Sequence, residues 1–280
     1  MALPFIQKIK ASHPKAEIYI ICKEWVSDIF KNHSGLKGII KLSNSDLKGL
    51  KNILSVGKML NSKNFDLSYT LTDSFRSAFI LWLSNIKVRI GFSAQLRGPL
   101  LSKQVTLPNI LIHRSEKYLK LIDGKNVNGA TPKFFLSKNE RLWAKTKMEQ
   151  IGFKNPTALF PFSVGSGRTL SAENIKKWIK GSSKNFLVFG SIKDAGKAKV
   201  LIKECENNSI KEVCGKFSLR QSISLIAICE SSIATDSGLG HISAALGIPT
   251  VSFFGKGNAL ETSPLGIKTK LIKHCNPCKG

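Results

Sequence analysis

The chain has 280 residues, 42% of them hydrophobic, and its 43 lysines and arginines outweigh 18 aspartates and glutamates to give a formal charge of +25. This length accommodates two globular domains, and no apolar run approaches the roughly 20 residues of a membrane-spanning helix. No signal peptide is recognisable at the N-terminus. The charge favours an anionic partner, which is a phosphorylated glycolipid, an anionic leaflet or nucleic acid.

The first half of the chain alternates helical and strand patterns, which predicts a parallel α/β sheet. In chain order we expect a helix over 1–10, strands over 17–22 and 38–42, a helix over 47–60, a strand over 65–71, a helix over 75–83, a strand over 88–92 and a helix over 115–121. A doubly wound domain normally opens on a strand, whereas this sequence opens on a helix. We therefore expect the first strand of this domain to be missing.

The second half repeats the α/β pattern after a charged helix over 137–151. We place the domain boundary at its end, which divides the chain into 1–150 and 151–280. A strand over 157–162 is followed by the small-residue loop 163–168, and a second strand over 186–189 ends at Gly190.

The loop 163–168 is a candidate phosphate site. Its backbone N–H groups and hydroxyls suit phosphate oxygens, and Arg168 supplies a positive charge. It is not a Walker motif, because no Gly-Lys-Ser/Thr is present. The alternative is a flexible Gly/Ser connector.

Residues 231–255 predict a βαβ unit, with a strand to Thr235, a turn at Asp236, a buried helix over 239–246 and a strand over 250–254. Gly247 suits the left-handed position after the helix. The helix N-terminus attracts phosphate through unpaired N–H groups. Asp236 as a simple N-cap is the alternative, and it is equally compatible with the spacing.

Six cysteines are present, and four of them, Cys22, Cys205, Cys214 and Cys229, are scattered in apolar or helical positions typical of reduced thiols. Cys275 and Cys278 form a CxxC with only His274 nearby, so we interpret them as structural thiols rather than as a zinc site. No metal and no cofactor are predicted.

The segment TDSGLGHISAALGIPTVSFFG over 235–255 resembles the nucleotide-sugar motif of the lipopolysaccharide heptosyltransferases, a GT-B glycosyltransferase family. Residues 65–92 resemble the second heptosyltransferase type in order and spacing, and 214–220 and 113–119 resemble further family patterns. The resemblance covers nearly the whole chain. Relative to the family, the first strand with its Ser-x-Gly-Asp loop and the final helix are absent, so we expect truncation at both ends.

The resemblance implies a GT-B architecture, with two Rossmann-like domains of parallel sheet facing a cleft. The second domain would bind the nucleotide sugar, and Arg168 would be the catalytic residue that neutralises the diphosphate. The substrate contacts would be made by Ser163, Gly165, Asp194, Phe217, Asp236, Ser237, Gly238, Leu239 and His241. For Asp194, Phe217 and the others an ordinary structural role is the alternative. In the family the region of Arg97, Lys103, His113 and Arg114 lies on the acceptor side, although each is also compatible with a solvated surface base. The family's base is the aspartate of the unmatched loop, so no residue here is given that role.

The function that follows is inverting, metal-independent transfer of heptose from ADP-heptose to the inner core of lipopolysaccharide. The expected partners are donor, acceptor and the anionic inner membrane at its cytoplasmic face, with no nucleic acid. The alternatives are another GT-B nucleotide-sugar enzyme such as a 2-epimerase, and a non-catalytic basic protein that binds glycolipid or nucleic acid. The last lacks interleaved aromatic and basic residues, since only 8% of the chain is aromatic.

Overall fold

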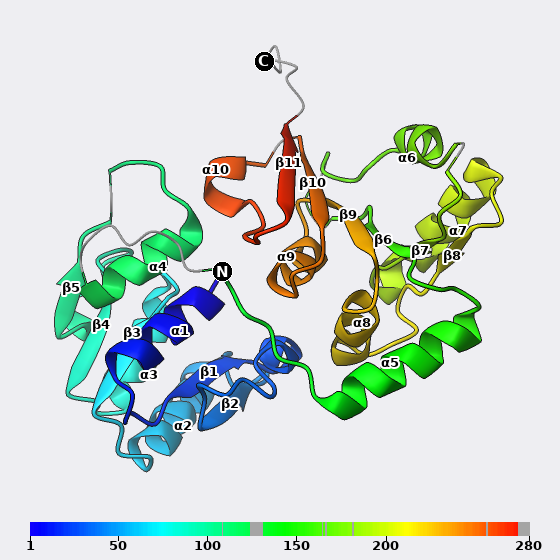
Figure 1. The fold of residues 1–280 in the computed structure, drawn as a ribbon. Coiled ribbons are helices and arrows are strands. Elements are labelled where there is room, and N and C mark those ends of the chain that lie inside the picture. The colour runs from blue at the N-terminus through cyan, green and yellow to red at the C-terminus, as the bar shows by residue number, and fades with distance from the viewer. Residues whose placement is uncertain are drawn as a thin grey trace. The chain divides into compact units, whose positions relative to one another are not determined.

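The computed structural model describes residues 1–107, 109–123, 131–163, 165, 167–180, 182–255 and 257–273. Its chain forms two compact units, Met1–Ala130 and Thr131–Gly280, each with its own parallel strands (Figure 1). Each unit also has two hydrophobic clusters of its own among the described residues. The four scattered cysteines are free, as predicted. Cys275 and Cys278 lie outside the described residues.

The first unit contains two parallel sheets. Its strands are β1 (Tyr19–Lys23), β2 (Gly38–Leu42), β3 (Leu67–Thr70), β4 (Val88–Phe92) and β5 (Lys103–Val105). Its helices are α1 (Leu3–Ser12), α2 (Leu50–Asn61), α3 (Phe75–Leu83) and α4 (Arg114–Asp123), with 3₁₀ turns η1 (Glu24–Ile29) and η2 (Gly98–Leu100). β1 pairs with β2, and β3, β4 and β5 pair in that order.

Helices pack on the sheets of the first unit through two separate clusters. Phe5 and Ile9 of α1 and Leu121 of α4 pack against Phe92 of β4. The second cluster joins α2 and α3 to β2 through buried side chains, namely Leu42, Val56, Leu60 and Ile80. Burial of these apolar side chains is what holds short strands together here.

The second unit is built on one parallel sheet of six strands. They are β6 (Thr157–Phe160), β7 (Phe186–Val188), β8 (Ile210–Glu212), β9 (Ser231–Thr235), β10 (Thr250–Phe254) and β11 (Thr269–Lys273), in the spatial order β11-β10-β9-β6-β7-β8. Its helices are α5 (Lys138–Ile151), α6 (Ala172–Ile179), α7 (Ala195–Cys205), α8 (Leu219–Ile226), α9 (Gly238–Ala245) and α10 (Ala259–Thr262), with a 3₁₀ turn η3 (Ile192–Asp194). Each pair of neighbouring strands in this sheet is parallel, which confirms the predicted α/β class.

Alternation along β6 separates the two faces of this sheet, because successive side chains of a strand point to opposite sides. Ala158 and Phe160 belong to the cluster that includes α5 and α8 residues, whereas Leu159 belongs to the cluster of α6 and α7. The sheet is thus the middle of three layers (Figure 1). A strand covered on both faces is predominantly apolar, and β6 is buried along its whole length, with Thr157 as its one polar residue.

The two units divide between Ala130 and Thr131, not at residue 150 as expected from sequence. The reason is the packing of α5, which lies on α8 and shares a core with β6. Trp143 of α5 meets Phe217 edge-on, with 5.7 Å between ring centroids. Helix α5 therefore belongs to the second unit.

No helix in the described part of the chain combines the length and apolar character that crossing a bilayer requires.

Candidate functional site

The strand order of the second unit reverses between β6 and β9. From β6 the chain adds β7 and β8 on one side, then returns to place β9, β10 and β11 on the other. Open parallel sheets bind ligands at such a switch point, outside the carboxyl ends of the strands. The segments that follow β6 and β9 are those predicted to bind phosphate.

These two segments are joined by hydrogen bonds. The Ser163 hydroxyl donates to the backbone carbonyl of Asp236 at 3.1 Å, and the Thr235 hydroxyl donates to the carbonyl of Arg168. The Arg168 Nη1 lies 2.9 Å from Asp236 Oδ2. The structure thus brings together Ser163, Arg168 and Asp236, as the sequence predicts.

The Arg168–Asp236 pair is asymmetric in exposure. The Asp236 side chain is 10% exposed and that of Arg168 is 39% exposed. A guanidinium has five N–H donors, and a single nitrogen accounts for the contact with Asp236. The carboxylate therefore orients the guanidinium, and among the described residues no other side chain is bonded to its remaining donors, which suit an anion.

Two glycines allow the backbone to approach this pair. A Cβ atom at Gly257 would lie 2.5 Å from Asp236 Oδ2, and one at Gly165 would lie 2.9 Å from Arg168 Nε. Gly165 is thus a packing position for the arginine side chain. Val164 and Ser166 of the same loop lie outside the described residues.

The N-terminus of α9 is open toward solvent. Ser237 is its N-cap but makes no side-chain capping bond, and its Oγ is buried with no hydrogen-bond partner among the described residues. A Cβ atom at Gly238 would meet nothing within 4 Å. Asp236 is not the N-cap, since Ser237 holds that position and Asp236 pairs with Arg168. An unused hydroxyl, an open glycine and the partial positive charge of the helix end suit an anion.

Leu239 and His241 follow in the first turn of α9. Leu239 packs on the cluster shared with α5 and α8, so its side chain supports the helix. The backbone N–H of His241 donates to the carbonyl of Ser237 at 3.4 Å. Gly247 has φ +80°, which confirms the left-handed residue expected after the helix.

Asp194 and Phe217 lie beyond the neighbouring strands, β7 and β8, where both make structural contacts. One Asp194 oxygen accepts from the Ser191 N–H at 2.9 Å and from its hydroxyl at 2.6 Å, which forms a capping box. Phe217 packs on Trp143 and lies under the Lys147 ammonium, 5.8 Å from the ring centroid. The described contacts do not join either residue to Asp236.

Of the four basic residues expected on the acceptor side, two are buried and two are exposed. Arg97 is fully buried and donates from Nε to the Phe92 carbonyl at 2.9 Å and from Nη1 to the carbonyls of Thr72 and Ser74. It is therefore not a solvated surface base. His113 is also buried, with Nδ1 2.7 Å from the Ser115 hydroxyl, whereas Lys103 and Arg114 are exposed.

A buried ion pair that sequence analysis missed lies in the second unit. Arg220 Nε is 2.5 Å from Glu140 Oε1, and Arg220 Nη2 also donates to the Phe135 carbonyl. Hydrogen bonding from Arg220 lowers the pKa of Glu140 to about 2, with further bonds from Ser137. Only the capping pattern Ser137-x-x-Glu140 signalled part of this arrangement.

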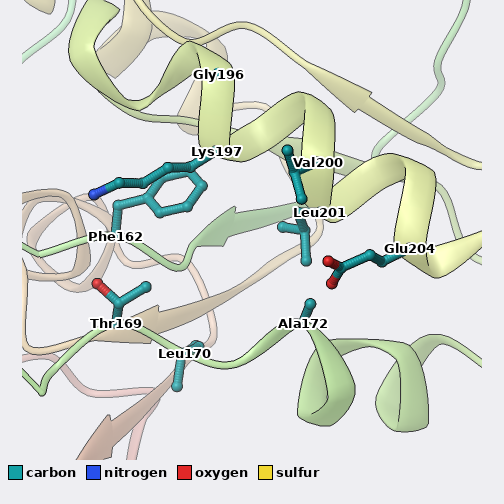
Figure 2. Close-up of a pocket in the computed structure, with 9 residues that line it drawn as sticks. All are labelled: Phe162, Thr169, Leu170, Ala172, Gly196, Lys197, Val200, Leu201 and Glu204. Atoms are coloured by element: carbon teal, nitrogen blue, oxygen red, sulfur yellow. The ribbon is translucent and has the colours of Figure 1, made fainter.

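A largely apolar pocket of about 390 Å³ lies beside the site, between α7 and the segment leading into α6. Figure 2 shows the Phe162 ring and the Lys197 side chain running side by side at one end and Glu204 at the other. None of the residues predicted to bind substrate lines it. Within the described residues, no group of three or more His, Cys, Asp or Glu side chains is arranged to hold a metal.

Comparison with known proteins identifies the family. The sequence profile of glycosyltransferase family 9 (heptosyltransferase) matches residues 53–280. The chain belongs to glycosyltransferase family 9. It is therefore a glycosyltransferase, as the sequence predicts.

Individual relatives named heptosyltransferase 2 match nearly the full length of this chain. Lipopolysaccharide heptosyltransferase 2 of Salmonella typhimurium is 26% identical, with 98% of this chain and 84% of the relative covered. Lipooligosaccharide heptosyltransferase 2 of Campylobacter jejuni is 29% identical, with 99% and 85% covered.

Solved structures support the fold. The Escherichia coli ADP-heptose lipopolysaccharide heptosyltransferase II aligns with TM-score 0.82 at 21% identity, covering 97% of this chain and 85% of that one. A UDP-GlcNAc 2-epimerase from Methanocaldococcus jannaschii aligns with TM-score 0.52. The structural neighbours include GT-B heptosyltransferases, which confirms the predicted fold class.

Proposed function

We propose that this family 9 enzyme transfers heptose from ADP-heptose to the inner core of lipopolysaccharide, with inversion at the anomeric carbon. The main support for a sugar-nucleotide site is the pairing of Arg168 with Asp236 at the β6/β9 switch point, beside the open N-terminus of α9. The names of the relatives supply the sugar and the acceptor.

The chemistry requires charge stabilisation of a departing diphosphate. As the anomeric carbon–oxygen bond breaks, negative charge grows on the ADP leaving group. The acceptor oxygen forms the new bond from the opposite face, and its proton passes to a general base. Arg168 and the N-terminus of α9 supply positive charge at that point. We propose that Asp236 and the Ser237 hydroxyl hydrogen-bond to hydroxyl groups of the sugar nucleotide. We propose that substrate contacts also involve Gly165, Asp194, Phe217, Gly238, Leu239 and His241.

The reaction is tested with purified protein, ADP-heptose and a heptose-deficient core acceptor. We expect ADP release and a heptosylated product only when the acceptor is present. Conversion of the sugar nucleotide without acceptor would instead indicate the 2-epimerase alternative. Because arginine and the helix end supply the charge, ADP binding should persist in chelator, and a strict magnesium requirement would contradict this mechanism.

We further propose that the protein works in the cytoplasm, in peripheral contact with the anionic inner membrane. The formal charge of +25 supports attraction to anionic lipid, and the proposed acceptor is itself a glycolipid. No nucleic acid partner is proposed.

A further inference from the structure

The outer face of α3 carries a row of aromatic side chains, exposed at its two ends and half-buried at Phe79, that donor binding does not use. Phe75, Phe79 and Trp82 follow the three- and four-residue spacing of one helix face. Their rings stack in succession, with centroids 6.0 Å and 5.9 Å apart. Phe75 is 46% and Trp82 48% exposed. A contiguous apolar surface of this kind marks an interaction site.

A strained loop extends the row at the N-terminal end of α3. Leu96 is 93% exposed and has φ 57°, a left-handed conformation that is uncommon for a bulky residue. Its neighbours are anchored, since Gln95 accepts from the Phe75 N–H at 3.3 Å and Arg97 is fixed to three carbonyls. The fold therefore holds this leucine in solvent, next to the residue that contacts the N-terminal end of α3.

Helix α2 continues the surface on the other side. A Cβ atom at Gly57 would lie 2.5 Å from the Leu83 Cβ of α3, so this side of α2 faces α3. Leu54 and Leu50 lie three and seven residues earlier, on the same side of the helix, and both are exposed. The α2–α3 apolar surface is thus formed by Leu50, Leu54, Phe75, Phe79, Trp82 and Leu96.

The charged side chains that α2 and α3 themselves carry have one sign, and the nearby Asp73 is paired with Lys117. Lys51, Lys58 and Arg76 are exposed on α2 and α3, and neither helix contains an acidic residue. No ion pair between these three and an acid is recorded in the described part of the chain. Aromatic and leucine side chains flanked by unpaired cations match the interface of an anionic bilayer, where apolar groups enter the headgroup–acyl boundary and cations meet lipid phosphates.

We propose that the α2–α3 apolar surface docks the protein on an anionic bilayer. The inference rests on the proposed function to the extent that the acceptor is a membrane glycolipid. The surface begins at Phe75 and Leu96, which follow the carboxyl ends of β3 and β4, respectively. These strand ends form the edge of the first unit where we expect the acceptor to bind. Docking there places the acceptor edge next to the lipid headgroups.

The test measures co-sedimentation of the full chain with vesicles of phosphatidylethanolamine and phosphatidylglycerol, and with phosphatidylcholine vesicles. We expect binding to the anionic vesicles, with Leu96→Ser combined with Trp82→Ser weakening it at least tenfold. The matched control is Trp25→Ser, because Trp25 is 68% exposed in the same unit but lies in η1. Brominated lipid should quench tryptophan emission in the wild type and lose this effect in Trp82→Phe.

Three results would overturn the proposal: no binding of the wild type to anionic vesicles, equal binding by the double variant, or equal loss in the Trp25→Ser control. A change in oligomeric state of the double variant, without loss of vesicle binding, would assign the surface to self-association. Thermal melts check that the variants fold. Transfer to a deacylated core acceptor tests the proposed function separately, and the double variant should retain it.

Discussion

Arg168 and Asp236 form the contact on which the proposed donor site depends. The Arg168 side chain of this ion pair is 39% exposed, so solvent screens the attraction, its contribution to stability is small, and its main effect is to orient the guanidinium. Arg168→Ala should weaken ADP binding by about 1.5–3 kcal/mol, as expected for loss of a charge-assisted hydrogen bond. Calorimetric titration measures this, with Lys197→Ala, a cation of the neighbouring pocket, as the control. Unchanged ADP affinity in Arg168→Ala would remove this residue from the site.

Glu140 is the residue whose titration should affect stability most clearly. Its pKa in the folded chain is about 2, against 4.5 for the free side chain, because Arg220 and Ser137 hydrogen-bond to the carboxylate. A depressed folded-state pKa contributes stability above the unfolded-state pKa, and this contribution is lost as the pH falls toward 2. Glu140→Gln should therefore lower the free energy of unfolding at pH 7, by on the order of 3 kcal/mol.

Urea denaturation at pH 7, 5 and 3 checks this prediction. The difference between wild type and Glu140→Gln should be large at pH 7 and 5 and smaller at pH 3. Glu149→Gln, on the exposed face of the same helix, is the control and should change little. A difference that is constant with pH would show that the ion pair is not its source.

Helix α9 contains two glycines, Gly238 and Gly240, whose substitution should affect different properties: ADP binding in one case and stability in the other. A Cβ atom at Gly240 would lie 2.9 Å from the Ala234 Cβ of β9, whereas Gly238 faces open space. Gly240→Ala should therefore lower the melting temperature by overpacking, at a cost of about 1–3 kcal/mol. Gly238→Val should leave the melting temperature nearly unchanged but weaken ADP binding at least tenfold, because the added methyls occupy the approach to the helix N-terminus. Equal ADP affinity in Gly238→Val would place the diphosphate elsewhere.

The elements that sequence predicts best are those with a clear periodic pattern. The bounds of β2, α3, β4 and β10 agree with the predicted ranges, since each is an apolar segment bounded by turn residues. Strands β8 and β11 escaped prediction because they lie at the sheet edges and contain charged residues. An edge strand needs fewer apolar side chains than a central one, so its pattern is weak.

The candidate site was predictable to the level of strand ends but not of individual contacts. That Ser163 and Asp236 meet follows from the βαβ pattern, because parallel strands end at one edge of a sheet. The ion pair of Arg168 with Asp236, the capping role of Asp194 and the burial of Arg97 depend on tertiary contacts. Sequence spacing alone carries no signal for these contacts.

At the scale of the whole molecule, donor binding should act on one of two folding units. Met1–Ala130 and Thr131–Gly280 have separate hydrophobic clusters, and the predicted ADP contacts all lie in the second. We therefore expect calorimetry of the full chain to show two unfolding transitions, of which ADP raises one. At an ADP concentration of about 100 times its Kd, linkage supplies about 2.7 kcal/mol, which corresponds to a shift of about 5–10 °C.

The transition that moves can be assigned with the variants already described. Glu140→Gln lies in the second unit and should lower the same transition that ADP raises, whereas Arg168→Ala should reduce the ADP-induced shift without lowering that transition in the absence of ligand. If ADP instead raises the transition that Glu140→Gln leaves unchanged, the nucleotide binds the first unit and the switch point between β6 and β9 is not the donor site.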